Sequence, residues 1–170
     1  MKNLFYLTSV LFVFILTSCS KDKKSETEDI SGRWDLVEMK MEGTFTESGM
    51  TINFNGITRN IQGENYIILN EDGTATGQNS PFDIEIEYEI MGQTTTVTIP
   101  VGNSLPESGT WEKTGSKLIF TADSTGESSE YTIKTLTSSS LILTADESAM
   151  DLGNDFPPNS TFEVTITLNR

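Results

Sequence analysis

Residues 82–101, FDIEIEYEIMGQTTTVTIPV, alternate between apolar and polar side chains in two halves joined by a glycine. The first half puts isoleucine and tyrosine on one face and Glu85, Glu87 and Glu89 on the other. This period of two is typical of a half-buried strand. The second half repeats it with valine and isoleucine against threonine. The segment therefore predicts an antiparallel hairpin.

A two-residue turn at Gly92-Gln93 would have glycine first, as a type II′ hairpin requires. This turn predicts that Tyr88 faces Val97, Ile86 faces Ile99, Ile84 faces Val101, Glu89 faces Thr96 and Glu87 faces Thr98. A slip of one residue would expose the whole apolar set, so the faces are strongly specified. Pro100 falls near the strand end, where one missing donor matters least.

The same alternation recurs along the chain and predicts eight to ten short strands separated by Gly, Ser and Asn-rich turns. The further strands are expected at 66–69, 74–76, 118–121, 131–136, 141–145 and 162–168. The one helical element expected is a short turn at 146–152, ended by Gly153. Such spacing indicates an antiparallel meander, and closure removes aggregation-prone edges. We therefore predict an all-β barrel over residues 30–170, in preference to a two-sheet sandwich.

Residues 1–18 have the layout of an export signal. Lys2 precedes the apolar run Leu4 to Leu16, and the small residues Thr17 and Ser18 follow it. As a helix, 13 residues would cover roughly 20 Å, short of the roughly 30 Å hydrocarbon core of a bilayer. The run therefore predicts a signal peptide and not a membrane span.

Cys19 is the only cysteine of the chain. Leu16-Thr17-Ser18-Cys19 resembles the lipobox of bacterial lipoproteins, which implies cleavage before Cys19 and acylation of that residue. Lipidation would remove a partnerless thiol from an oxidising compartment, and several acyl chains would anchor firmly. The alternative interpretation is an ordinary secretory signal that ends near a cysteine.

Residues 19–29 follow as a tether, since Ser20 to Asp29 carry no apolar side chain. The resemblance implies a protein held at the outer membrane of the cell envelope by a lipid anchor. A charged stretch after the cysteine also resembles the export signals of some surface lipoproteins, so a periplasmic and a surface-facing position both stay open. Oligomeric state is not indicated.

Charge and composition narrow the chemistry. Residues 30–170 hold 7 basic against 21 acidic side chains, which disfavours nucleic acid and anionic membrane surfaces as partners. The chain has no histidine, the usual general base and the commonest transition-metal ligand. We therefore predict no enzyme activity, no cofactor and no metal site.

Four motifs carry a resemblance across residues 30–170. They are Gly32 to Trp34, Leu69 to Thr74, Gly109 to Trp111 and Gly115 to Leu118. Together they resemble the small lipocalin-like domains of bacterial lipoproteins, with G-x-W on the first strand, N-x-D-G-T, G-T-W and G-x-K-L. The resemblance implies a barrel whose tryptophan, here Trp34, plugs one end beneath a late arginine.

The sequence departs from the lipocalins in two places. No helix is expected after the last strand, and the threonine-aspartate-tyrosine motif has no counterpart. Arg170 ends the chain, and either packs on Trp34 through a cation–π contact or frays, as chain ends usually do. We favour fraying. Ligand transport is therefore not inherited from the resemblance.

The main candidates for an apolar ligand site are Trp34, Met39, Met41, Phe54 and Tyr88. Met50 is a further candidate. Methionine adapts to varied ligands, but the same side chains could equally fill the interior. An eight-stranded barrel has room either for packed side chains or for one small molecule. The sequence leaves both outcomes open.

Two groups of acidic residues are candidates for catalysis or for metal binding. Glu85, Glu87 and Glu89 stand about 7 Å apart along one strand face, a spacing seen in some inverting glycosidases, but they share the wet face with threonines. Loop 146–160 offers Asp146, Asp151 and Asp155 without EF-hand spacing. We expect a solvated exterior in the first case and no calcium site in the second.

The sequence thus predicts a lipid-anchored envelope protein whose lipocalin-like barrel binds a small apolar molecule or a protein partner. One alternative is a structural or interaction module with a packed interior. A weaker alternative is a carboxylate-based hydrolase. Cavity volume in the barrel separates the first two.

Overall fold

A computed structural model describes residues 29–102, 105–146 and 160–170. Within these residues the chain is all β, with eleven strands and no helix. The strands are β1 (Gly32–Glu47), β2 (Met50–Arg59), β3 (Tyr66–Leu69), β4 (Thr74–Gln78), β5 (Phe82–Ile90), β6 (Gln93–Val101), β7 (Ser108–Thr114), β8 (Lys117–Ala122), β9 (Ser128–Leu136), β10 (Ser140–Asp146) and β11 (Thr161–Asn169). The signal peptide, Cys19, nearly all of the tether and residues 147–159 lie outside the described residues. The helical turn expected at 146–152 therefore stays a prediction, except that Asp146 ends β10.

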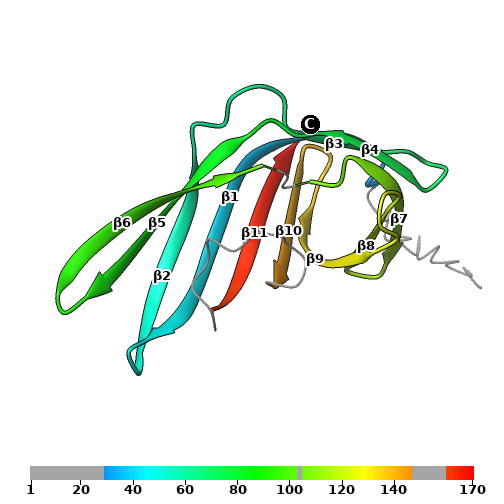
Figure 1. Ribbon diagram of the computed structural model, residues 1–170. Coiled ribbons are helices and arrows are strands. Elements are labelled where there is room, and N and C mark those ends of the chain that lie inside the picture. The colour runs from blue at the N-terminus through cyan, green and yellow to red at the C-terminus, as the bar shows by residue number, and fades with distance from the viewer. Residues whose placement is uncertain (1–28, 103–104, 147–159) are drawn as a thin grey trace, which may run out of the picture.

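Eight strands close into an antiparallel barrel, which confirms the predicted fold class. The sheet runs β11-β10-β9-β8-β7-β4-β3-β1, and β1 pairs again with β11 to complete the circle. We call these eight strands the ring. The closing β1–β11 ladder is long, extending from the Asp35–Asn169 pair to the Thr44–Thr161 pair. Figure 1 shows the ring curling around on the side of β7 and β8.

Three further strands lie outside the ring. We call β2, β5 and β6 the extension, because they continue the sheet from β1 in the order β1-β2-β5-β6. β1 belongs to both parts: Gly32 to Asp35 pair with β3, and Lys40 to Glu47 pair with β2 along the same edge. Figure 1 shows the extension splaying away from the ring on the side opposite β7 and β8.

A bulge in β1 lies where the strand changes partners. Leu36 pairs with Leu168 and Glu38 with Thr167, so Val37 is one residue more than β11 can match. An extra residue bends its strand and reverses which side chains face inward. Accordingly Trp34 and Leu36 are buried before the bulge, and Met39 and Met41 after it. The bulge leaves Val37 itself 48% exposed.

The β5–β6 hairpin has the predicted faces but not the predicted register. Ile90 pairs with Gln93, so the turn is Met91-Gly92, whose φ angles of 52° and 76° are both positive, as a type I′ turn requires. The predicted register was therefore wrong by two residues. The observed pairs are Tyr88 with Thr95, Ile86 with Val97, Ile84 with Ile99, Glu89 with Thr94 and Glu87 with Thr96. A shift of two conserves the faces.

The G-T-W motif and the N-x-D-G-T motif are hydrogen-bonded to each other. The Trp111 indole N–H donates to the Asn70 carbonyl at 3.0 Å, and the Trp111 backbone N–H donates to the Gly73 carbonyl at 2.8 Å. Inside this β3–β4 turn, the Thr74 hydroxyl and backbone N–H donate to Asp72. These bonds lower the pKa of the Asp72 carboxyl. The turn thus anchors β7 against β3 and β4.

Trp34 and Arg170 pack together where β1 begins and β11 ends. The Trp34 ring is fully buried, and its N–H donates to the Ile30 carbonyl at 2.7 Å. The Arg170 guanidinium stacks 4.1 Å from the centre of that ring and donates to the carbonyls of Asp29, at 2.9 Å, and Ser31. The expectation that Arg170 frays was wrong, because the face of the Trp34 ring and two backbone carbonyls all attract its positive charge.

Candidate functional site: the barrel interior and the extension

Among the described residues, the cavity that the ring encloses is very small. It has a volume of about 10 Å³, about the minimum that holds one water molecule. Ring side chains such as Leu118, Leu141 and Ile166 surround it, and Phe120 and Tyr131 pack edge to face with ring centres 5.7 Å apart. Leu105 is also buried there, held by the Asn79 side chain, which accepts from the Leu105 N–H and donates to its carbonyl. No small-molecule ligand fits this space without rearrangement.

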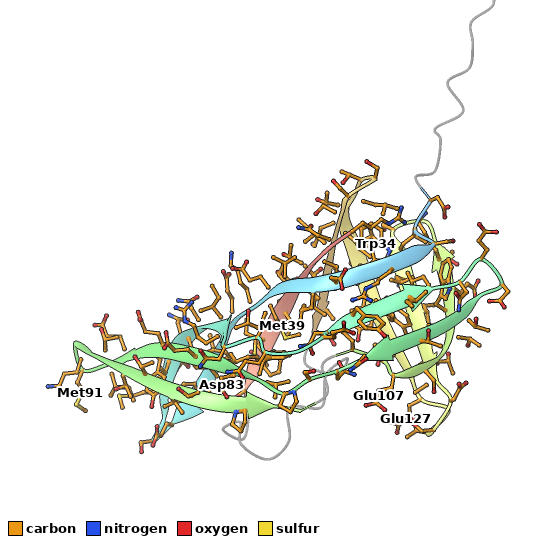
Figure 2. All side chains as sticks on the ribbon, turned by 90° about the horizontal axis from the view of Figure 1, so that it is seen from above. Trp34, Met39, Asp83, Met91, Glu107 and Glu127 are labelled. Atoms are coloured by element: carbon orange, nitrogen blue, oxygen red, sulfur yellow. The ribbon has the colours of Figure 1, made fainter. Side chains whose placement is uncertain are left out.

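The five predicted ligand residues do not surround that cavity. Trp34, Met39, Met41 and Phe54 are all at most 2% exposed, and Tyr88 is half-buried. Trp34 lies near the start of β1 next to Arg170, whereas Phe54 and Tyr88 lie on β2 and β5. Figure 2 shows the separation between Trp34 and Met39 along β1. As placed, these residues contribute to core packing along β1 and the extension.

An aromatic cluster covers the apolar face of the extension. Phe45 packs edge to face on Tyr88 with ring centres 5.4 Å apart, and Phe54 lies 6.2 Å from Phe45 and 6.3 Å from Phe162. These four rings join β1, β2, β5 and β11. Sequence reasoning singled out Phe54 and Tyr88 but missed Phe45 and Phe162. The alternation of Phe162 with Val164 and Ile166 was the available signal.

The opposite face of the extension carries an open groove. It crosses β1, β2 and β5 and has a volume of about 300 Å³. Its polar lining includes Lys40, Glu42, Asn55, Arg59 and Glu87. Asn55 is paired with Glu42 on one side and with Glu87 on the other, which spaces these two carboxylates across three strands. Charges of both signs therefore share one shallow surface.

The three glutamates considered as catalytic lie along this face. Glu87 and Glu89 are exposed, and Glu85 is half-buried, with one carboxylate oxygen 3.2 Å from the Arg59 guanidinium. Each sits beside a threonine of β6, namely Thr98, Thr96 and Thr94 in order. The row is open to water as expected.

Two other findings concern ions and membranes. In residues 29–102, 105–146 and 160–170, no three acidic or cysteine side chains are grouped so as to hold a metal ion. Asp151 and Asp155, two of the candidate calcium ligands, lie outside these ranges. No helix in the described part of the chain has the length and apolar character needed to cross a bilayer.

Comparison with known proteins returns no match: neither family models, curated proteins nor solved structures resemble the chain significantly. The class defined by the structure is thus the closed antiparallel barrel, here with an attached three-stranded extension. The lipobox and lipocalin-like resemblances stay predictions from the sequence.

Proposed function

We propose that this chain is a lipid-anchored protein of the cell envelope, held at the outer membrane through Cys19. Its lipocalin-like barrel acts as a filled scaffold that presents its outer surface to a protein partner. Of the two occupants predicted from the sequence, a small apolar molecule and a protein, the second is favoured. The observation that carries this choice is the interior cavity of about 10 Å³.

Surface features support the same choice. Ligand pockets for small molecules usually enclose about 300–1,000 Å³ behind mostly apolar walls. The groove on the extension reaches that size but is open and carries Lys40, Glu42, Arg59 and Glu87. A surface of this kind suits the polar contacts of a protein interface better than the burial of an apolar molecule.

Membrane fractionation tests the anchor. Cys19→Ala should move the protein from the membrane to the soluble fraction, because the acyl chains would have no attachment point. Ser20→Ala, one residue further, should leave the protein in the membrane fraction. If Cys19→Ala still fractionates with membranes in the same proportion as Ser20→Ala, the anchor proposal is wrong.

Native mass spectrometry tests the filled barrel. The purified protein should show no co-purifying apolar molecule beyond lipid attached covalently. Leu118→Ala, which removes a fully buried side chain beside the small cavity, is the positive control, because it creates space that hexane or benzene can occupy. An apolar molecule bound one to one in the unaltered protein would instead establish a small-ligand carrier.

A further inference from the structure

β6 is the free edge of the sheet. Among the described strands it comes last in the sheet order and pairs with β5 alone, from Gln93 to Val101. Residues Gln93 to Thr98 are all exposed. The barrel closure that protects the ring from edge pairing therefore does not protect the extension.

The hairpin register shows which backbone groups face outward. In a two-residue turn, the residues that flank it exchange a hydrogen bond, and bonded and non-bonded pairs then alternate along an antiparallel ladder. Starting from Ile90–Gln93, the non-bonded positions on β6 are Thr94, Thr96, Thr98 and Pro100. Three N–H groups and four carbonyls thus point away from β5. Pro100, which has no N–H, falls in this outward set, as an edge proline should.

This edge lacks most of the devices that usually prevent strand addition. Natural edges carry charges, bulges or prolines along their length. Residues 93–99, QTTTVTI, contain no charged side chain, and the β5–β6 register is continuous across them. Pro100 limits the open stretch at one end only. Six of these seven residues are β-branched threonine, valine or isoleucine, which favour extended backbone.

A row of carboxylates runs beside the edge. Glu85, Glu87 and Glu89 lie on β5 opposite Thr98, Thr96 and Thr94. Glu85 is paired with Arg59, but no ion pair engages Glu87 or Glu89 among the residues that the structure describes. A strand added to β6 would lie two spacings from β5, about 9.6 Å. A lysine or arginine side chain can cross that distance over a threonine.

We propose that the β6 edge binds an extended, basic segment of a partner protein, which adds to the sheet as a further strand. This inference rests on the proposed function and names the partner's chemistry. Lysine or arginine opposite Thr94, Thr96 and Thr98 would face the glutamates. Alternate apolar residues would lie on the other face, beside Val97, which is 41% exposed.

Charge favours a basic segment over a second copy as the occupant. The chain carries a net charge of −14, and antiparallel β6–β6 pairing would bring two rows of glutamates onto one sheet face. Like charges oppose such an approach, whereas a basic segment gains from it. Main-chain bonds would supply affinity, and the alternating side chains would supply specificity, as in other strand additions.

A peptide titration tests the proposal. The probe is fluorescein-labelled Lys-Val-Lys-Thr-Lys-Val-Lys, and the protein is the full chain in a non-ionic detergent. Anisotropy should report saturable binding that weakens with salt, and NMR should show shifts of the Thr94, Thr96 and Thr98 amides. Matched controls replace every lysine by glutamate, or N-methylate alternate peptide residues to remove their donors. Neither control should bind.

Two pairs of variants locate the site. Glu87→Gln and Glu89→Gln should each weaken binding about two- to fivefold, as exposed ion pairs do. Thr96→Pro removes an outward N–H without touching the β5–β6 ladder and should weaken binding about tenfold, while Thr96→Val should leave binding unchanged. If Thr96→Pro misfolds, the N-methylated peptide still tests whether main-chain hydrogen bonds are needed, because it removes donors from the peptide instead of from β6.

Several results would overturn the proposal. They are equal binding of the lysine and glutamate peptides, amide shifts elsewhere than β6, or no binding at any peptide concentration. A monomer–dimer equilibrium that Thr96→Pro abolishes would assign the edge to a second copy. The proposed function is tested by different results. It fails if an apolar molecule is found inside the barrel or if Cys19→Ala stays in the membrane fraction, whatever the outcome of the peptide titration.

Discussion

The ring and the extension are built from the same alternating pattern, but only the ring closes, and the extension keeps a free edge at β6. In the ring, every strand has two neighbours, and the apolar side chains fill the enclosed interior. In the extension, β6 has one neighbour, and the apolar face is covered by aromatic side chains such as Phe45 and Phe162. Alternation thus specifies which side chains share a face of the sheet, whereas the pairing partners of each strand decide whether the sheet closes.

The course of β1 explains why one chain forms both a closed ring and an open extension. The bulge at Val37 bends β1 after its short ladder with β3, and the strand then continues far enough to pair with β2. Since β1 keeps β11 as its other neighbour from Asp35 to Thr44, on both sides of the bulge, the ring stays closed. Stability should therefore concentrate in the ring, and local opening in the extension.

The largest effect is expected from Trp34→Ala. Removing this fully buried ring from β1 should lower the free energy of unfolding by about 3–5 kcal/mol, since the surrounding core cannot fill the space. Urea denaturation followed by circular dichroism measures the change. Met91→Ala at the tip of the extension, a side chain 87% exposed, should stay within about 0.5 kcal/mol of the unaltered protein. Equal losses for the two variants would contradict the contrast.

Arg170→Ala should cost less, about 1–2 kcal/mol. The variant loses the cation–π contact with Trp34 and the bonds to the Asp29 and Ser31 carbonyls. Arg170→Lys should recover part of this, because an ammonium cannot stack and bridge in the same way. The control in the extension is Arg59→Ala, whose exposed ion pair with Glu85 should contribute below about 0.5 kcal/mol. Thermal denaturation of the four proteins decides the ranking.

Gly92→Ala and Gly115→Ala compare a turn of the extension with a turn of the ring. Both glycines have positive φ, 76° and 62°, and an added Cβ would meet no atom within 4 Å at either site. Each substitution should cost about 1 kcal/mol of backbone strain. Hydrogen exchange should show faster opening confined to β5 and β6 for Gly92→Ala, and a global change for Gly115→Ala. Identical exchange patterns would mean that the extension unfolds only with the ring.

The smallest effect on stability is expected from the Tyr131 phenol, and it appears only at alkaline pH. Burial raises the pKa of the Tyr131 phenol above its ordinary 10.0, and a bond with Ser129 opposes this shift. Tyr131 therefore ionises at lower pH in the unfolded chain than in the folded one, so its contribution to stability is constant below about pH 10 and falls as the pH rises above it. Urea midpoints between pH 9 and 11 should fall less steeply for Tyr131→Phe. Parallel curves would show that the phenol does not contribute.

Much of the fold was predictable because period-two alternation is a local signal. Most of the strands and the outward glutamates follow from it, whereas closure was predicted from the strand number and from the cost of free edges. β2 was not among the expected strands, and the eleven strands found exceed the eight to ten predicted. The hairpin register did not, since methionine rarely adopts the positive φ that Met91 has, and a turn at Gly92-Gln93 matched sequence preferences better. The extension was also missed, because the bulge at Val37 that permits it leaves no composition signal.

The candidate sites were less predictable than the fold. A list of large apolar residues cannot say whether side chains fill a barrel or line it, and here the volume is decided by packing among Leu118, Leu141 and their neighbours. The free edge of β6 was missed for a different reason. Assuming closure of all strands removes edges by definition, whereas only eight of the eleven enter the circle.

Arg170 has a mechanical consequence. Its guanidinium holds the carbonyls of Asp29 and Ser31, at the point where the chain enters β1. A pull applied from the amino-terminal side would reach the first and the last strand together, along their length. The load would then be divided between the two strands and passed on to their other neighbours, β2 and β3 on one side and β10 on the other, instead of falling on the start of β1 alone.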